Sequence, residues 1–352
     1  MNDRNTPPLE LSEKLALHLA FVAGELPRPL LRLFPPSGGG PSRYPNCDND
    51  RSVEDVIAKY RLLASRQVDD DFFPVARVNF GTAMMAALAG GHYSCDGETT
   101  WAHPAAGSAV GVHVPALDEE LPLWRDYKTK LRALRDAEIP GVMLGQPVMN
   151  GPLDIAADLL GPEQLALDTM LEPDAVAALL SKCAELWKQV FDSHARELGF
   201  AGDGMVTTFD NFMPGHSAIW SEDFSALIGP ETYQKFGLGL DGELARHLDS
   251  SIIHIHSAAG RCLSTIKNIE SLSVVEISND PSGPPLASIL EWATEIQAAG
   301  KSVMLSNWEH PLADRDVDEI LDRLDRRRLL VTLQCTSDAQ AAAYRQKFLR
   351  LE

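Results

Sequence analysis

The sequence is short of positive charge, of cysteine and of long apolar runs, and each shortage excludes a class of protein. Lysine and arginine total 31 against 50 acidic residues, a formal net charge of −19. A general electrostatic hold on nucleic acid or an anionic membrane is therefore not expected, because both carry negative phosphate. Five scattered cysteines do not indicate a disulfide framework and favour a cytoplasmic protein. The apolar stretch 15–34 is broken by charged residues before it reaches the length of a membrane span.

A segment rich in proline, glycine and serine, residues 34–50, divides the chain. Before it, the pattern predicts an amphipathic helix followed by a second, proline-broken helical turn. We therefore predict two parts, an N-terminal helical arm with its linker over 1–69 and a main body over 70–352. The length and the apolar content suit a large core, and the negative net charge favours small molecules or proteins as partners.

From residue 70 onward, apolar runs of strand length alternate with amphipathic stretches of helix length. Seven runs are clear: 72–80, 141–150, 203–211, 251–257, 273–280, 301–307 and 328–335. Residues 107–117 are a weaker candidate for an eighth strand. Repeated strand-then-helix order indicates a parallel sheet, and eight such units predict a (β/α)8 TIM barrel with an N-terminal helical extension. An open, doubly wound α/β sheet is the alternative.

Several of these runs end in polar residues, and in a barrel the carboxyl ends of the strands form the active site. His254 and His256 are two positions apart, so both imidazoles project from one face of a strand. Glu276 lies in the next strand, and Cys335 ends the last one. Imidazole, carboxylate and thiolate are zinc ligands, so we predict a zinc site of these four residues, with Glu276 as a fourth ligand or as a partner that fixes an imidazole. The alternatives are a backbone bond for His256, an ion pair for Glu276 and simple burial of Cys335.

Two aspartates are candidate catalytic residues. Asp210 stands at a predicted strand end and Asp223 just before a predicted helix. Either side chain is a candidate substrate contact or proton shuttle. The alternatives are a turn residue for Asp210 and a charge that complements the helix dipole for Asp223.

Three segments carry a family resemblance: "GPLDIAADLLGPEQLALDTMLEPDAVAALL" from residue 151, "IGPETYQKFGLG" from residue 228 and "IIHIHSAAG" from residue 252. Their order and spacing resemble the uroporphyrinogen decarboxylase superfamily, which implies a (β/α)8 barrel. True uroporphyrinogen decarboxylase has an arginine-rich segment that grips acidic side chains, and this sequence reads "VNFGTAMMAALAG" after its first predicted strand. The chain therefore looks closer to the superfamily's zinc- and corrinoid-dependent methyltransferase branch.

In that branch the zinc ligands resemble His-x-Cys at one strand end and a later Cys, sometimes with a Glu between. His254 matches the His, His256 stands where the first Cys would be, and Cys335 and Glu276 match the remaining two. The resemblance implies methyl transfer between a corrinoid, carried on a partner protein, or a methylated small molecule and an acceptor. With one thiolate fewer, the zinc would be a stronger Lewis acid. The alternatives are a cofactor-free decarboxylase and a non-catalytic corrinoid- or metabolite-binding protein.

Overall fold

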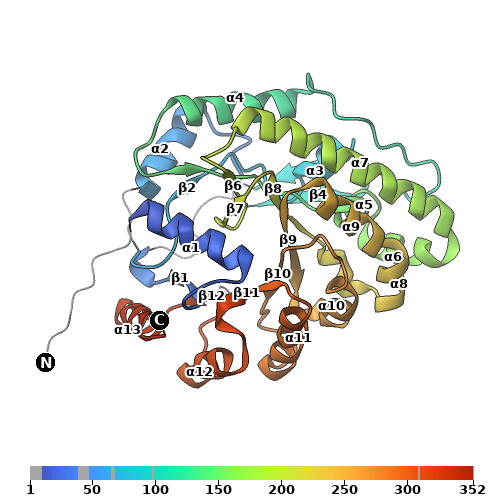
Figure 1. Cartoon of the computed structure of the whole chain (residues 1–352). Helices are drawn as coiled ribbons and strands as arrows, with labels where there is room; N and C mark the ends of the chain where they lie inside the picture. The colour runs from blue at the N-terminus through green and yellow to red at the C-terminus, as the bar shows by residue number, and fades with distance from the viewer. Residues whose placement is uncertain (1–9, 39–46, 65–67, 97–98, 308–309, 352) are drawn as a thin grey trace, which may run out of the picture.

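The computed structural model describes residues 10–38, 47–64, 68–96, 99–307 and 310–351, and these form an α/β fold around a parallel sheet (Figure 1). Six strands make up the main sheet, and every neighbouring pair is parallel. In spatial order they are β1 (Leu30–Phe34), β12 (Leu329–Gln334), β11 (Ser302–Asn307), β10 (Val274–Ser278), β9 (Ser250–His256) and β8 (Ser217–Ser221).

Helices separate consecutive strands in the second half of the chain, which confirms the predicted alternation. From β8 to the last helix they are α8 (Pro230–Phe236), α9 (Leu238–His247), α10 (Gly260–Ile266), α11 (Leu286–Ala298), α12 (Asp314–Arg323) and α13 (Asp338–Leu349). The others are α1 (Leu11–Ala23), α2 (Val53–Ala64), α3 (Met84–Leu88), α4 (Pro122–Asp136), α5 (Pro152–Leu160), α6 (Pro162–Leu171) and α7 (Pro173–Leu198). Short 3-10 helices are η1 (Pro36–Gly38), η3 (Asp223–Leu227), η4 (Ser257–Ala259) and η5 (Arg326–Arg328).

The remaining strands are short and pair among themselves. They are β2 (Val75–Ala76) with β5 (Met143–Leu144) in parallel, and the antiparallel pairs β3 (His92–Cys95) with β4 (Thr100–His103) and β6 (Gly204–Val206) with β7 (Phe212–Pro214). Isolated parallel bridges join Gly145 to Val206 and Asn150 to Ser221. In the described residues, hydrogen bonds therefore give a parallel α/β sheet but not a continuous ring of eight strands.

Two predicted elements differ from the structure. Residues 107–117 contain no strand. Residues 30–34, expected to continue a helical turn, form β1, which pairs with β12 at one edge of the main sheet. Pro29 disfavours helical geometry at the residue before it, and the leucines that follow are buried on both faces of the sheet. The first 69 residues thus contribute a strand to the sheet, while the predicted division at residue 69/70 stays a prediction.

The strands separate two apolar layers, because successive side chains point to opposite faces. The larger layer lies between the sheet and its covering helices, and Val275, Leu305 and Val331 belong to it. The smaller layer lies on the inner face and includes residues of α1 and of all six strands of the main sheet: Phe21, Leu26, Leu30, Phe72, Met213, Ile219, Ile252, Val274, Met304 and Leu330. Helix α1 therefore packs against the inner face, and the polar residues that follow Ile252 and Val274 lie further toward the strands' carboxyl ends.

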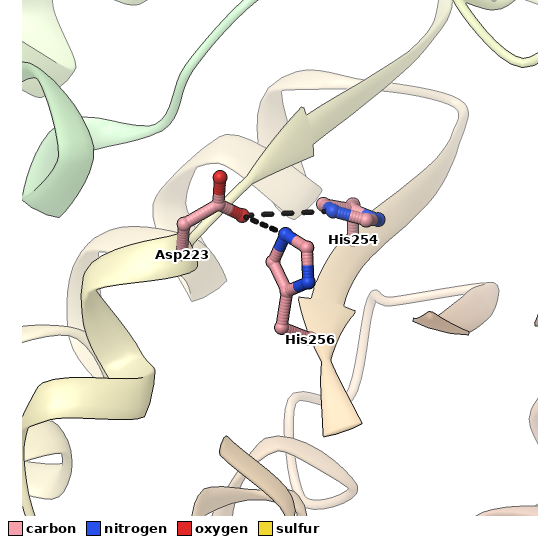
Figure 2. A group of neighbouring side chains, drawn as sticks. All are labelled: Asp223, His254 and His256. Atoms are coloured by element: carbon pink, nitrogen blue, oxygen red, sulfur yellow. Dashed lines mark ion pairs between the residues drawn. The ribbon is translucent and has the colours of Figure 1, made fainter. Parts of the chain in front are cut away.

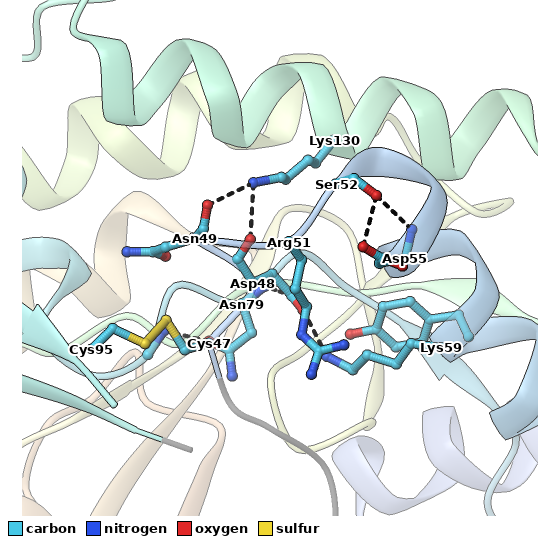
Figure 3. A network of polar contacts seen from close by, with 12 residues as sticks. Cys47, Asp48, Asn49, Arg51, Ser52, Asp55, Lys59, Asn79, Cys95 and Lys130 are labelled. Carbon is cyan, nitrogen blue, oxygen red and sulfur yellow. Dashed lines mark hydrogen bonds and ion pairs between the residues drawn. A yellow bond between two sulfur atoms is a disulfide. The ribbon is translucent and has the colours of Figure 1, made fainter. Parts of the chain in front are cut away.

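Cys47 and Cys95 form a disulfide, a pairing that the scattered cysteine positions did not predict (Figure 3). Its neighbour Asp48 accepts the backbone N–H of Asn79 and pairs with Lys59 Nζ at 3.0 Å. Lys130 Nζ donates to the backbone oxygen of Asp48 at 2.9 Å. These contacts hold the segment that follows residue 46 against Asn79, near the end of the predicted strand 72–80.

None of the helices in the described part of the chain combines the length and the apolar character that a membrane span requires.

Candidate metal centre

Three side chains converge at the carboxyl end of β9. His254 and His256 lie on the inner face of that strand, as their spacing predicted, and Asp223 opens η3 beside them (Figure 2). Asp154 of α5 positions the start of η3, because its carboxylate accepts the backbone N–H groups of Asp223 at 2.9 Å and Phe224 at 2.8 Å. The carboxylate of Asp223 then faces both imidazoles.

The distances between the three ligand atoms fit a metal ion with tetrahedral coordination. Asp223 Oδ1 lies 3.5 Å from His254 Nε2 and 3.6 Å from His256 Nε2. One ligand atom from each residue lies within 4.8 Å of the other two. With zinc–ligand bonds of about 2.0 Å, tetrahedral ligand atoms are roughly 3.3 Å apart. The group could therefore take a zinc ion with small adjustments and keep a position for a further ligand.

Each imidazole is oriented by a second carboxylate. His254 Nδ1 donates to Glu276, which sits opposite it in the register of β9 and β10. His256 Nδ1 donates to Asp280 Oδ1 at 2.7 Å, and Ser257 Oγ holds the other oxygen of Asp280 at 3.0 Å. Carboxylates in these positions are typical of metal-binding histidines, since they fix the tautomer and aim Nε2 at the ion.

The local charge is strongly negative. Burial would lower the pKa of His254, but Glu276, Asp223 and Asp154 together raise it to about 9. Burial and the charge of Asp223 raise the pKa of Asp158 to about 7, and they raise that of Asp154 well above its usual range. A divalent cation among these groups would relieve the repulsion between the carboxylates. The donor set and its electrostatics therefore fit a metal ion.

Cys335 is predicted as a thiolate ligand, and Glu276 either as a fourth ligand or as the partner that fixes an imidazole. Among the described residues, the group that could hold a metal contains neither of them. Glu276 contacts Nδ1 of His254, the position of a partner that fixes an imidazole. Cys335 continues the alternation of Val331 and Leu333, so it belongs to the apolar layer under the helices, and its Sγ lies 3.8 Å from the backbone oxygen of Leu333. Burial raises the pKa of its thiol to about 11.

Asp210, the other catalytic candidate, pairs with two arginines. Its backbone is left-handed, with φ of 65°, which is uncommon for a residue with a side chain. Its carboxylate forms ion pairs with Arg32 of β1 and with Arg77, just after β2. The ring of the preceding Phe209 lies 5.3 Å from that of His254, nearly perpendicular to it.

Sequence reasoning missed Asp280, Arg32 and Arg77. Asp280 carried a usable signal, since it is four residues past Glu276 in the same alternation. Arg32 was overlooked because its segment was predicted to be helical. Arg77 was overlooked because it lies inside a predicted strand and no catalytic or metal-binding motif lies next to it in the sequence.

The whole fold is similar to that of a known enzyme. A solved structure of a methyltransferase from Methanosarcina mazei matches with a TM-score of 0.66 and 13% sequence identity, covering 96% of this chain and 99% of that one. No family model matches the sequence, and no curated protein does. At this identity the likeness shows the fold, and the chemistry must be argued from the site.

Proposed function

We propose that this protein is a zinc-dependent methyltransferase of the uroporphyrinogen decarboxylase superfamily. The observation that carries the proposal is the convergence of Asp223, His254 and His256, with Glu276 and Asp280 behind the two imidazoles. The structural likeness to a methyltransferase over nearly the full length of both chains supports it. The isolated bridges at Val206 and Ser221 support a closed (β/α)8 arrangement of the strands.

Asp223, His254 and His256 would hold the metal, with Asp223 in place of the Cys335 thiolate that the resemblance implied. When bound, zinc would lower the pKa of an acceptor heteroatom and hold it toward the methyl group. Glu276 and Asp280 keep both Nε2 atoms directed at the ion. Because His254 is protonated near neutral pH in the metal-free protein, it gives up a proton when it binds metal. Phe209 covers one side of His254 and keeps water from its ring.

The methyl donor in this proposal is a corrinoid on a partner protein or a methylated small molecule. The side-chain exposures support an approach from the side of Asp223, which is 48% exposed, whereas His256 is 35% and His254 9% exposed. A donor would therefore approach over Asp223 and His256, with His254 at the bottom of the site.

The test is the metal content of the purified protein after zinc loading and desalting. We expect close to one zinc per chain in the wild type and loss of zinc in Asp223→Asn and His256→Gln, because each exchange removes one of three ligands. Cys335→Ser is the matched control, and it should keep its zinc because Cys335 lies on the opposite face of the sheet.

Turnover is then measured as demethylation of free methylcobalamin by the zinc-loaded protein with a thiol acceptor. Loss of zinc in Cys335→Ser and not in Asp223→Asn would reject our ligand set. Absence of zinc from every form would reject the metal-dependent reaction and favour the cofactor-free decarboxylase. Zinc binding without turnover on any methyl donor would favour the non-catalytic binding protein.

A further inference from the structure

Helix α6 exposes a row of apolar side chains to solvent. Leu167, Met170 and Leu171 are 48%, 80% and 64% exposed, and their spacing of i, i+3 and i+4 places them on one side of the helix. The opposite side is also apolar, since Leu165 lies in the larger core layer. A helix that is apolar on opposite sides is normally covered on both. The exposed side of α6 therefore indicates a surface that a partner covers.

A groove continues this row along helix α7. It has a volume of about 490 Å³, lies between residues 109–116 and α7, and is lined largely by apolar side chains such as Val112 and Ala178. Asp168 of α6 joins the groove to the row, because its carboxylate accepts the backbone N–H of Ala109 at 2.6 Å and Ala109 lines the groove. The exposed row of α6 and this groove together are called the α6–α7 surface below.

The α6–α7 surface carries an excess of negative charge. Residues 152–181 include six acidic residues and no lysine or arginine. Three of the acidic residues are exposed at the two ends of α6 and the start of α7: Glu163, Glu172 and Asp174. The next cation along the chain, Lys182, pairs with Glu185 at 2.8 Å. A second copy of this chain would bring the same charges to the surface, whereas a positively charged partner is complementary to it.

The length of the groove indicates what kind of segment fits it. Its lining on α7 runs from Ala175 to Gln189. Fourteen helical steps rise by about 21 Å, so a partner helix of roughly 14 residues has the matching length. An amphipathic helix laid into an apolar groove is a common mode of protein recognition.

We propose that the α6–α7 surface is the docking site for an amphipathic helix of a partner protein, whose apolar face is flanked by lysines or arginines. The apolar face would lie in the groove and on the exposed row of α6. The basic residues would face Glu163, Glu172 and Asp174. This docking site does not depend on the proposed function, because no ligand of the candidate metal centre belongs to it.

The test titrates the full-length protein into two fluorescein-labelled synthetic helices and follows fluorescence anisotropy. Both peptides have about 14 residues and leucine along one face, and the remaining positions are lysine in one peptide and glutamate in the other. We expect the lysine peptide to bind with a micromolar dissociation constant. The glutamate peptide should bind at least about tenfold more weakly, because only lysine complements the carboxylates of the surface.

Variants separate this surface from unspecific attraction. Leu171→Lys should weaken binding of the lysine peptide about tenfold, because it removes an apolar contact and adds a like charge. The unfolding temperature should not change, since Leu171 is largely exposed. Leu62→Lys is the matched control. Leu62 is 57% exposed on α2, well away from α6 (Figure 1), so this variant should bind the peptide as the wild type does.

The contribution of charge is measured in the double variant Glu163→Gln, Glu172→Gln. It should bind the lysine peptide several-fold more weakly than the wild type, and its affinity should fall less steeply as salt is added. An affinity and a salt dependence equal to those of the wild type would show that these carboxylates do not face the partner helix.

The outcomes decide between the possible occupants of the surface. No binding of the lysine peptide, equal affinities for the two peptides, or equal weakening in Leu171→Lys and Leu62→Lys would each overturn the proposal. Sedimentation equilibrium of the protein alone tests a second copy. A wild-type dimer that becomes a monomer in Leu171→Lys would show that this chain covers its own α6, and would overturn docking of a different protein. No metal enters these measurements, so their failure leaves the zinc proposal intact.

Discussion

At the scale of single residues, two histidines of one strand have different surroundings. The His254 side chain is 9% exposed and bonded to a fully buried glutamate, whereas that of His256 is 35% exposed and bonded to the less buried Asp280. The inner imidazole is therefore fixed, and the outer one faces the side from which a substrate would arrive. The spacing of the pair was readable in the sequence, but this difference depends on how deeply each residue lies in the fold.

A third histidine allows a prediction about pH. His194 of α7 is fully buried, its Nδ1 accepts the hydroxyl of Tyr127 at 2.6 Å, and burial lowers its pKa to about 3. Below the unfolded pKa of about 6.5 the unfolded chain binds a proton here that the folded chain does not, so this residue makes stability fall as pH falls from 6.5 toward 3. In His194→Asn that contribution should vanish, and stability should fall less steeply by up to ~1.4 kcal/mol per pH unit.

The measurement is the free energy of unfolding in urea between pH 7 and pH 4 for both proteins. Asparagine still accepts the Tyr127 hydroxyl, so folding is retained. His92→Asn is the control, since that exposed imidazole meets water in both states. Parallel curves for wild type and His194→Asn would contradict the assignment.

At the scale of elements, α1 and β1 connect the first residues to the main sheet. Helix α1 places Phe21 in the inner apolar layer, and the Ser302 hydroxyl donates to the backbone oxygen of Phe21 at 2.6 Å. β1 pairs with the last strand of the chain. The segment predicted as a separate arm therefore supports the face of the sheet whose far end carries the candidate metal centre.

The packing of α1 gives a second prediction. Phe21 is 1% exposed, so Phe21→Ala should lower the free energy of unfolding by about 3–5 kcal/mol. Leu19→Ala, on the same helix but 37% exposed, should cost under about 1 kcal/mol. Urea unfolding followed by circular dichroism measures both. Equal losses in the two variants would show that α1 does not pack on the inner face.

At the scale of the whole molecule, a buried ion triad joins both ends of the chain. Asp71 is 0% exposed and receives a two-pronged contact from Arg28, at 2.6 and 2.7 Å, and a 2.7 Å contact from Arg345 of α13. Its carboxylate also accepts the backbone N–H of Leu31 at 2.8 Å. Burial alone would raise the pKa of Asp71, but the two arginines hold it below its usual value.

Removing the shared carboxylate should destabilise the whole molecule. Asp71→Asn leaves two buried arginines without their common counter-charge, so we expect a loss of about 3–5 kcal/mol in the free energy of unfolding. Asp69→Asn is the control, because Asp69 also pairs with Arg345 but is 57% exposed, and it should cost under about 1 kcal/mol. A small effect of Asp71→Asn in urea unfolding would argue against the triad as a link between the two ends.

The sequence by itself determined the alternation of strands and helices and the shared face of His254 and His256, because both follow from local periodicity. It also determined the negative net charge, because net charge is the sum of the charges of the individual residues. Only the tertiary structure decided that Asp223 joins the two histidines, that Glu276 and Asp280 lie behind them, and that Cys335 points to the helix-covered face. These placements depend on sheet register and on where a loop crosses a strand end. Both are set by packing between segments far apart in the chain, which no local pattern records.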